Sequence, residues 1–413
     1  MAFLLVFILS ISLVPTIAFK TNKTTAPAQA AWPTGATTFA QAVNMTDGIR
    51  RDGNNYYIST AEGLNLLSDL KDAPGSVDKN FNPDWTFYLE NDIDMSAYER
   101  FTIGSNANEF TGTFDGQGHS IILNIKSSGI VESGSGLFQY AKDVIIKKLT
   151  IKGSIRSSNS SIGSLVGIAR GKVTIISCIN EALIMSDSTV GGFVGTFGDA
   201  IFSGTDLMIF NCVNRGELSG GNVGGAVGFL TGDPAEVQNV YINRFYNFAS
   251  IEGDLVAGGV IGGNKNCLCV ISQVYIDNIL ITGYSVAGII GSSTYDVIIS
   301  EAAVHTNLET TNSTLECFST AKMISDSYFI GNVGNVVLSH NVYQCAGVFT
   351  HTTHKYEYDK RKDYYGGFTN EKWVVGVNNG TAGLRRFLAV GTAAPVEDVE
   401  AHLKDLGYAQ SQY

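Results

Sequence analysis

The feature that most constrains the fold is a short glycine-rich phrase that returns about every 30 residues. Its six clear copies occupy residues 135–139, 163–167, 191–195, 224–228, 258–262 and 287–291. Their last residues lie 28, 28, 33, 34 and 29 positions apart. A period of this length is typical of solenoids, in which each coil buries its apolar side against the next coil.

The segments between the glycine phrases have the pattern of short strands. Residues 144–152 (VIIKKLTIK) and 240–243 (VYIN) alternate apolar and polar residues, and helical periodicity is almost absent. Two weaker copies of the phrase, at 317–320 and 346–350, continue the spacing. The repeat therefore predicts an all-β chain, folded as a parallel β-solenoid whose coils stack about 4.8 Å apart.

A second feature keeps the same register. Asn180, Asn214 and Asn247 lie 34 and 33 residues apart. Asparagines stacked in neighbouring coils can hydrogen-bond to one another through their side chains, as they do in other cross-β stacks. We therefore expect a ladder of asparagine side chains along the solenoid.

The residue two positions before each asparagine points in the same direction from its strand. These residues are Cys178, Cys212 and Phe245, which we expect to form a buried column. Neighbouring coils would place Cys178 and Cys212 about 5 Å apart between Cα atoms, which permits a disulfide. Two buried free thiols, acting as small apolar groups, fit the same column.

The open ends of a solenoid are exposed sheet edges that need a cover. A capping box at residues 59–62, followed by leucines on one face, predicts a helix over 59–70 at the N-terminal end. At the other end Val396, Val399, Leu403 and Leu406 lie on one face of a predicted capping helix, 395–406. Short capping helices are thus predicted at both ends.

The first 18 residues have the pattern of a signal peptide. An uncharged apolar run, residues 3–14, precedes small residues that allow cleavage after Ala18. We therefore expect a secreted or cell-surface chain with no membrane span after cleavage. Within this compartment glycosylation is predicted at Asn22, Asn159 and Asn312, each followed two positions later by Ser or Thr.

These observations divide the chain into five segments. They are a signal peptide (1–18), a partly disordered N-terminal linker (19–55), an N-terminal cap with the first coil (56–121), a solenoid of about 30-residue coils (122–350) and a C-terminal extension (351–413).

The phrase FTGTFDGQGHSI at 110–121 is the longest recognisable motif. With the repeated Gly-Gly-x-Val-Gly and Cys-x-Asn phrases, it resembles the GLUG-repeat proteins over residues 56–348. The resemblance implies a right-handed parallel β-helix in a secreted, adhesin-like or surface protein. The glycines of the repeat are lost after Gly291, which leaves the C-terminal boundary of the resemblance open.

The net charge and the absence of common catalytic motifs argue against several classes of function. The chain carries 27 Lys and Arg against 38 Asp and Glu, and the net charge of −11 repels the phosphates of nucleic acids. The sequence contains no HExxH, GxSxG or Walker motif. We therefore predict no nucleic-acid partner, no cofactor, no metal and no catalytic residue.

Three groups of side chains have chemistry that could argue against this prediction. Asp92, Asp94, Asp115 and His119 have the chemistry of a carbohydrate-cleaving site, but Asp115 lies in a Gly-rich phrase typical of a tight turn. His351 and His354 have the spacing of a weak metal pair, which is common in loops. The aromatic and basic run 356–368 predicts ligand contact through Tyr364 and Tyr365.

The leading hypothesis is a non-catalytic β-solenoid that acts as an adhesion or binding scaffold for glycans, matrix or a host surface. A polysaccharide lyase or hydrolase of the β-helix type is the first alternative. A self-assembling wall or coat protein is the second alternative.

Overall fold

The computed structural model describes most of the chain between Trp32 and Thr310 and short strands beyond it. The described residues are 32–75, 77–127, 134–158, 161–198, 204–233, 235, 238–293, 297–310, 330–333, 336–338, 342–345, 349–350, 374–377 and 385–388.

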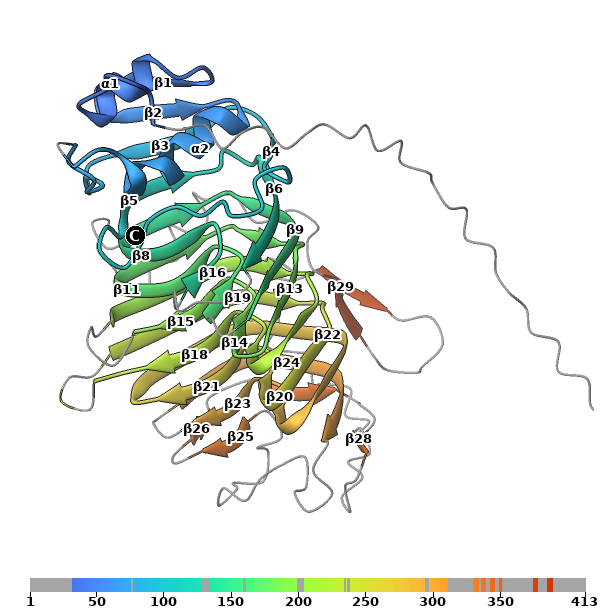
Figure 1. Ribbon diagram of the computed structural model, residues 1–413. Helices are drawn as coiled ribbons and strands as arrows, with labels where there is room; N and C mark the ends of the chain where they lie inside the picture. Colours follow the sequence, from blue (N-terminus) through green and yellow to red (C-terminus); the bar gives the residue numbers. More distant parts are fainter. Residues whose placement is uncertain are drawn as a thin grey trace, which may run out of the picture.

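The chain winds into a β-solenoid, as the repeat predicts (Figure 1). Twenty-eight of the described strands form one hydrogen-bonded sheet, in which the strands after β2 pair in parallel with a strand of the coil before, of the coil after, or of both. The antiparallel pairing in this sheet is between β1 (Ile49–Asp52) and β2 (Asn55–Ile58), at the N-terminal end. The predicted all-β solenoid is therefore confirmed.

Each coil contributes strand segments to four stacked columns. The first column, which starts with β1 and β2, continues through β3 (Thr86–Leu89), β5 (Phe110–Asp115), β8 (Phe138–Lys147), β11 (Val166–Ile176), β16 (Gly204–Asn214), β19 (Gln238–Asn247), β22 (Cys267–Ala287), β24 (Val297–Thr310) and β26 (Val336–Leu338). The second contains β4 (Ile93–Asp94), β6 (Ser120–Ser127), β9 (Thr150–Ser157), β13 (Leu183–Ser186), β17 (Leu218–Gly224), β20 (Ile251–Gly258) and β28 (Phe349–Thr350).

The other two columns are built from shorter strands and from parts of the long ones. The third contains β7 (Gly134–Ser135), β10 (Ser161–Gly163) and β14 (Thr189–Gly191), and the fourth contains β15 (Val194–Phe197), β18 (Val227–Thr231), β21 (Ile261–Lys265), β23 (Ile290–Ser293) and β25 (Ile330–Val333). The remaining strands are β12 (Ile179–Asn180), β27 (Val342–Cys345), β29 (Val374–Val377) and β30 (Arg385–Leu388).

The glycine phrases form the corner between the third and fourth columns. A Cβ atom at Gly225 would lie 2.1 Å from the carbonyl oxygen of Gly259 in the next coil, and one at Gly192 would lie 2.0 Å from that of Gly225. Such distances exclude a side chain, so glycine lets neighbouring coils approach closely at this corner. This contact explains the glycine at the second position of the later phrases. One coil earlier the equivalent residue is Ser164, which is buried and donates its hydroxyl to the carbonyl oxygen of Gly192.

The predicted asparagine ladder is present at a second corner. Asn180 Nδ2 donates to Asn214 Oδ1 at 2.8 Å, and Asn214 Nδ2 donates to Asn247 Oδ1 at 3.0 Å. Asn247 Nδ2 ends the series on the carbonyl oxygen of Gly259 at 2.8 Å. All three side chains are fully buried, and the ladder satisfies amide groups that would otherwise destabilise the core.

Between the first column and the asparagine ladder the chain turns through a residue with positive φ in each coil. Ser177, Asn211, Arg244 and Gln273 have φ values of 54°, 54°, 51° and 54°. Two side-chain hydrogen bonds join them in pairs, from Asn211 Nδ2 to Ser177 Oγ at 3.0 Å and from Arg244 Nε to Gln273 Oε1 at 3.2 Å. These bonds offset part of the cost of left-handed backbone in residues other than glycine.

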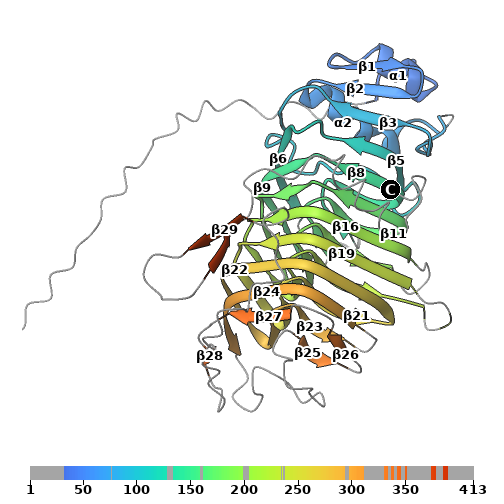
Figure 2. The same cartoon turned by 180° about the vertical axis from the view of Figure 1, so that it is seen from behind.

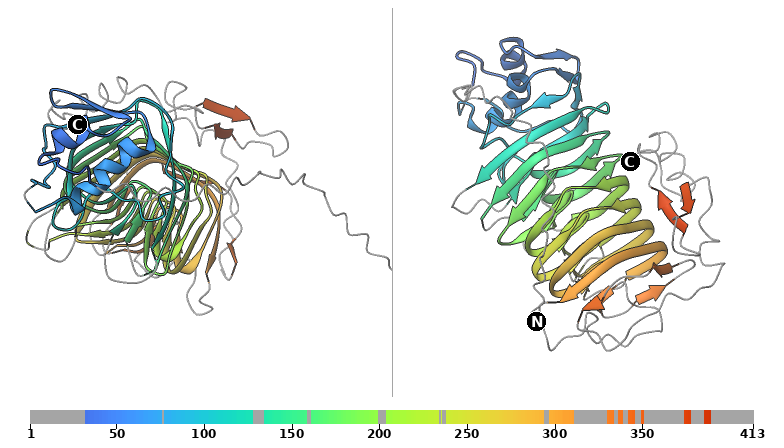
Figure 3. Two further views of the ribbon diagram at one scale, coloured as in Figure 1. Left: turned by 45° about the horizontal axis from the view of Figure 1, so that its top comes forward. Right: turned by 90° about the vertical axis from the view of Figure 1, so that its right-hand side faces the viewer.

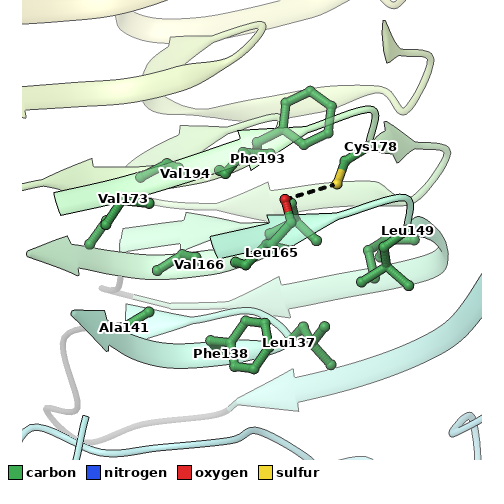
Figure 4. Close-up of a cluster of buried hydrophobic side chains, with 14 of the residues drawn as sticks. Leu137, Phe138, Ala141, Leu149, Leu165, Val166, Val173, Cys178, Phe193 and Val194 are labelled. Atoms are coloured by element: carbon green, nitrogen blue, oxygen red, sulfur yellow. Dashed lines mark hydrogen bonds between the residues drawn. The ribbon is translucent and has the colours of Figure 1, made fainter. Parts of the chain in front are cut away.

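The interior between the columns is filled by apolar side chains in register (Figure 4). Phe138, Val166 and Val194 pair across three successive coils, and all three are fully buried. Cys178 and Cys212 lie in the buried column predicted for them, beside Phe245. Both cysteines are free thiols in the structure, so a bridge between them stays a prediction.

The N-terminal end carries two helices, α1 (Phe39–Asn44) and α2 (Ala61–Asp69), which lie over the first coils (Figure 3). The N-cap of α2 is Thr60, whose hydroxyl accepts from Gly63 N at 3.2 Å, so the helix starts later than the predicted Ser59. A 3-10 turn at Leu70–Asp72 follows α2. The α1 helix and β1 lie inside the segment expected to be a linker, where Phe39 packs on the core.

Most of the predictions for the C-terminal part of the chain concern residues outside the described ranges. The weak copies of the phrase at 317–320 and most of 346–350, and the capping helix 395–406, lie outside the described residues. None of the helices in the described part of the chain is long and apolar enough to cross a membrane.

Candidate ligand pocket at the N-terminal end

A pocket of about 430 Å³ opens beside the first two coils, in the range typical of small-ligand sites. It lies between the start of α1, the paired strands β1 and β2, and the segment that leads into β3. Its lining residues are Thr38, Phe39, Ala40, Arg51, Tyr56, Asp78, Asn80, Phe81, Asn82, Pro83 and Trp85.

Aromatic rings form the apolar part of the lining. The ring of Trp85 stacks on Phe39 with centroids 5.2 Å apart and meets the edge of Tyr56 at 5.1 Å. Phe39, Tyr56 and Phe81 are buried, whereas Trp85 is partly exposed. The pocket therefore has an aromatic wall that is supported from behind by the core.

The local sequence fixes the position of Trp85. Asn82 forms a turn in which its Oδ1 accepts from Asp84 N at 2.9 Å and its carbonyl oxygen accepts from Trp85 N at 3.0 Å. The carbonyl oxygen of Trp85 then accepts from Thr113 N of the next coil at 2.9 Å. The tryptophan is thus held by a turn on one side and by a strand on the other.

Polar groups surround the aromatic wall. Asp78 Oδ1 accepts from both N and Nδ2 of Asn80, at 3.0 and 2.9 Å, and this turn faces the pocket from the loop before β3. Arg51 Nε donates to the carbonyl oxygen of Gly53 at 2.6 Å, and its guanidinium carbon lies 5.8 Å from the centre of the Tyr56 ring. The exposed Arg51 adds a positive charge to the lining of the pocket.

Two hydrogen-bonding groups of the lining have no partner among the described residues. These groups are the indole N–H of Trp85 and the hydroxyl of Tyr56. Burial raises the pKa of Tyr56 above its ordinary value, and the charge of Arg51 acts in the opposite sense. The Tyr56 hydroxyl is therefore neutral at physiological pH and is a donor as well as an acceptor.

This combination suits a ligand with an apolar face and several hydroxyl groups. Aromatic rings bind apolar C–H faces, and the carboxylate, amide and guanidinium groups around them form hydrogen bonds in fixed directions. In the part of the chain that the structure describes, no cluster of three or more His, Cys, Asp or Glu side chains suits a metal ion. The pocket has the features of a binding site.

The four residues with the chemistry of a carbohydrate-cleaving site do not line this pocket. They are Asp92, Asp94, Asp115 and His119, and each of the three carboxylates accepts a hydrogen bond from a backbone N–H. Asp92 Oδ1 accepts from Ser120 N at 2.7 Å, Asp94 Oδ1 accepts from Ser96 N at 2.8 Å, and Asp115 Oδ1 accepts from Gln117 N at 2.9 Å. The turn predicted at Asp115 is therefore present.

Two of these carboxylates, Asp115 and Asp92, also lie close to a basic side chain. Asp115 is almost fully buried, and its Oδ2 lies 3.6 Å from Lys147 Nζ. His119 Nδ1 lies 3.5 Å from Asp92 Oδ1. The hydrogen bond from Ser120 N is the main cause of the lowered pKa of Asp92, so this carboxyl is unsuited to act as a general acid.

The other residues singled out from the sequence, whether predicted as sites or only considered, lie outside the described part of the chain. They are the glycosylation sites Asn22, Asn159 and Asn312, the ligand contacts Tyr364 and Tyr365, and the histidines His351 and His354.

The pocket itself was not predicted from the sequence. Residues 81–87 (FNPDWTF) could have indicated part of the pocket, because three aromatic residues flank an Asn-Pro-Asp turn. The sequence does not show that Phe39 and Tyr56, which lie far from this turn along the chain, complete the same wall.

Comparisons with known proteins leave the family open. No family model matches the chain, and no curated protein matches it. A crystal structure from Bacteroides ovatus, described as a "putative immunoglobulin A1 protease", has 18% identity and a TM-score of 0.48 over 82% of this chain and 93% of that chain. A similarity at this level supports no inference about activity, and the GLUG repeat stays a resemblance.

Proposed function

We propose that this protein is a secreted binding scaffold for glycans, and that the N-terminal pocket is its sugar-binding site. The observation that carries the proposal is the partly exposed Trp85, whose indole N–H has no partner among the described residues and whose ring is part of an aromatic wall. Sugar rings present an apolar C–H face to such a wall and hydroxyl groups to the polar side chains around it.

The solenoid supplies the rigidity that such a site needs. Each coil is hydrogen-bonded to the next along several columns, and the strands below the pocket continue without interruption into the rest of the sheet. Arg51 and Tyr56 of the lining lie on β1 and β2, and the loop before β3 is tied to the next coil through the hydrogen bond from Thr113 N to the carbonyl oxygen of Trp85. A site held in this way loses little conformational freedom when it binds, which favours affinity. The export signal predicted for residues 1–18 is consistent with extracellular glycans as ligands.

The direct test measures binding of the purified chain to a panel of neutral and acidic oligosaccharides by isothermal titration calorimetry. For each ligand that binds, the variant Trp85→Ala should weaken binding by about tenfold or more, the loss expected for one stacking ring. Arg51→Ala, at an exposed residue, should weaken it less and without a change in folding.

A matched control is available in Trp32. This tryptophan is also partly buried against the core, but its Nε1 donates to the carbonyl oxygen of Ala36 at 3.0 Å and it does not line the pocket. The variant Trp32→Ala should therefore keep the affinity of the natural chain. Equal losses in Trp32→Ala and Trp85→Ala, or binding unaffected by both Trp85→Ala and Arg51→Ala, would show that the pocket is not the site.

The contacts predicted at Tyr364 and Tyr365 provide a second position to test. We propose that they extend the bound glycan surface, and the double variant Tyr364→Ala, Tyr365→Ala should then weaken binding of long polysaccharides more than of short ones. A loss confined to this double variant would move the site from the pocket to the C-terminal extension.

The lyase or hydrolase alternative makes a different prediction for the same ligands. If the protein cleaves polysaccharides, their chain length should fall after long incubation with the folded protein, with calcium present or after chelation. We expect unchanged chain lengths. The self-assembly alternative predicts concentration-dependent polymers of the protein itself, which light scattering would detect.

A further inference from the structure

The two consecutive arginines of β1 have different surroundings. Neighbouring residues of a strand point to opposite sides, so the side chains of Arg50 and Arg51 lie on different faces of β1. Their register partners on β2 are Tyr57 and Tyr56. Figure 2 shows β1, β2, β3 and α1 together at the N-terminal end of the solenoid. One strand therefore presents two arginines whose partners can be compared.

Arg50 has partners within the chain. Its Nη2 lies 2.6 Å from Glu90 Oε1, and its guanidinium carbon lies 3.8 Å from the centre of the Tyr57 ring. It is not among the residues that line the pocket. The positive charge of Arg50 is therefore balanced by a carboxylate of the protein itself.

Arg51 lines the pocket and has no such partner. Its Nε donates to the carbonyl oxygen of Gly53, which holds the guanidinium in place and leaves its terminal nitrogens for other contacts. No ion pair joins Arg51 to a carboxylate among the described residues, and this includes Asp78, the other charged residue of the lining. The pocket thus contains a positive charge that no direct contact with a described residue neutralises.

The hydroxyl of Tyr56 lies within the electric field of this charge. Tyr56 is only 1% exposed, and its hydroxyl has no hydrogen-bond partner among the described residues. Burial raises the pKa of Tyr56, and the charge of Arg51 lowers it. The guanidinium therefore favours negative charge near this hydroxyl, where a bound anion would also accept the hydroxyl proton.

The hydrogen-bonding groups left over in the lining are mainly donors. Within the described structure, donors without a partner are present on Arg51, Tyr56, Asn82 and Trp85. The Oδ1 of Asn82 already accepts from Asp84 N, and the Oδ1 of Asp78 already accepts from Asn80. A ligand that supplies more acceptors than donors suits this set of groups.

We propose that the sugar bound in the pocket is acidic, and that its carboxylate accepts hydrogen bonds from Arg51 and Tyr56 while its ring lies against Trp85. This inference rests on the proposed function and names the class of ligand. An ionised carboxylate only accepts hydrogen bonds, and its two oxygens match the planar fork of a guanidinium. The hydroxyl groups of the sugar remain for Asp78 and Asn80.

The acidity of the whole chain does not oppose this assignment. The net charge of −11 is carried by a chain of 413 residues. At physiological ionic strength the interaction between exposed charges is largely screened beyond about 8 Å. The groups that line the pocket therefore determine which ligand is bound, and among them Arg51 is the residue that selects the acidic class.

The test uses matched pairs of oligosaccharides and isothermal titration calorimetry of the full chain. The pairs are trimers of galacturonic, glucuronic and mannuronic acid, each with its carboxyl-reduced neutral form. The members of a pair share linkages and ring stereochemistry and differ only in a carboxylate or a CH2OH group. In about 0.15 M salt the acidic member of a pair that binds should bind about fivefold more tightly, and this difference should shrink as the salt concentration rises.

Three variants assign the difference to a residue. Arg51→Ala should abolish the difference between the acidic and the neutral member of a pair. Arg51→Lys keeps the charge without the planar fork and should retain part of it. Arg50→Ala is the matched control, because it removes the same charge from the same strand at a residue that already has a partner, and it should keep the full difference.

Failure of this inference can be distinguished from failure of the proposed function. If acidic and neutral members bind equally and Trp85→Ala weakens both, the pocket binds sugars but the acidic class is wrong. A difference that survives in Arg51→Ala, or that Arg50→Ala removes as fully, would also overturn the role of Arg51. Tighter binding of sulfated sugars than of any carboxylated trimer would replace the carboxylate with another anion. If no member of any pair binds, the proposed function fails as well. The salt series on the natural chain needs no variant, so it decides even where a variant does not fold.

Discussion

The first coils and the central coils fill their interiors with different kinds of side chain. Around Phe110 the interior is a cluster of aromatic rings, with Phe138 at 4.2 Å, Phe81 at 5.0 Å and Phe87 at 5.6 Å between centroids. From Leu165 to Ile290 the interior holds mainly aliphatic side chains, with thiols and the asparagine ladder at one corner.

The difference follows from what each region must pack against. A central coil has a near-copy of itself on both sides, so its interior repeats small side chains and its glycine corner repeats with them. The first coils meet two helices and an antiparallel strand, and large rings fill this irregular space. The same irregularity leaves the pocket at Trp85, which has no equivalent in a regular stack.

The largest expected effect comes from removing one ring in each region. The variant Phe110→Ala should lower the free energy of unfolding by about 3–5 kcal/mol, because it leaves a cavity among the neighbouring rings of Phe81, Phe87, Phe114 and Phe138. Phe245→Ala removes an equally buried ring whose neighbour is Phe193, at 6.2 Å, and should have a cost in the same range. Urea denaturation followed by circular dichroism measures both.

The two variants should differ in which coils lose protection from hydrogen exchange and in whether glycan binding weakens. Since each coil contacts only its neighbours, hydrogen exchange should rise near residues 39–140 in Phe110→Ala and near 193–276 in Phe245→Ala. Glycan binding should weaken in Phe110→Ala alone. Equal loss of protection along the whole solenoid in both variants would contradict the division into two regions.

The next effect tests the central coils alone. The variant Asn214→Ala removes the ladder partner of Asn180 Nδ2 and of Asn247 Oδ1. Because Asn247 Oδ1 still accepts from Ala249 N at 3.1 Å, the expected cost is about 2–3 kcal/mol, mainly for the buried Asn180 amide. Asn239→Ala is the matched control, because its amide donates to Asp206 Oδ1 at 3.1 Å from a partly exposed position. A similar cost in both variants would mean that the ladder adds nothing beyond an ordinary surface hydrogen bond.

Much of the central region could be predicted from the sequence, because the same contacts between neighbouring coils recur in each repeat. The glycines of 224–228 and 258–262, and the spacing of Asn180, Asn214 and Asn247, follow from contacts that each coil makes with the next. The corner at Ser177, Asn211, Arg244 and Gln273 could not be predicted, since four different residue types adopt the positive φ there.

The N-terminal pocket was missed for a related reason. It depends on contacts that occur once, such as that of Phe39 with Trp85, and nothing elsewhere in the sequence repeats them. The helix at 59–70 was predicted nearly in full, because a threonine cap and a leucine face are local signals.

A smaller effect concerns pH and the helix that covers the first coils. Burial, with a contribution from Asp72, raises the pKa of Asp69 to about 7, compared with 3.8 in an unfolded chain. The folded state therefore binds more protons than the unfolded state between about pH 4 and 7, and the free energy of unfolding should fall as the pH rises through this window.

The size of this pH dependence should be on the order of 2 kcal/mol, with little further change from Asp69 above pH 7. The variant Asp69→Asn, which can still accept from Asn65 Nδ2, should lose this part of the dependence. Chemical denaturation at a series of pH values measures it. If the free energy of unfolding of the natural chain, relative to that of Asp69→Asn, rose between pH 4 and 7, the raised pKa of Asp69 would be contradicted.

The smallest expected effect is at Asp92, and it separates the binding scaffold from the enzyme alternative. The variant Asp92→Asn keeps an oxygen that can accept from Ser120 N, so the unfolding midpoint and glycan affinity should stay as in the natural chain. Polysaccharide chain lengths should be the same with the natural protein, with Asp92→Asn and without protein. If the natural protein shortened the chains and Asp92→Asn did not, the Asp92–His119 pair would be catalytic despite its backbone hydrogen bond, and the first coils would hold the active site of an enzyme rather than a binding pocket alone.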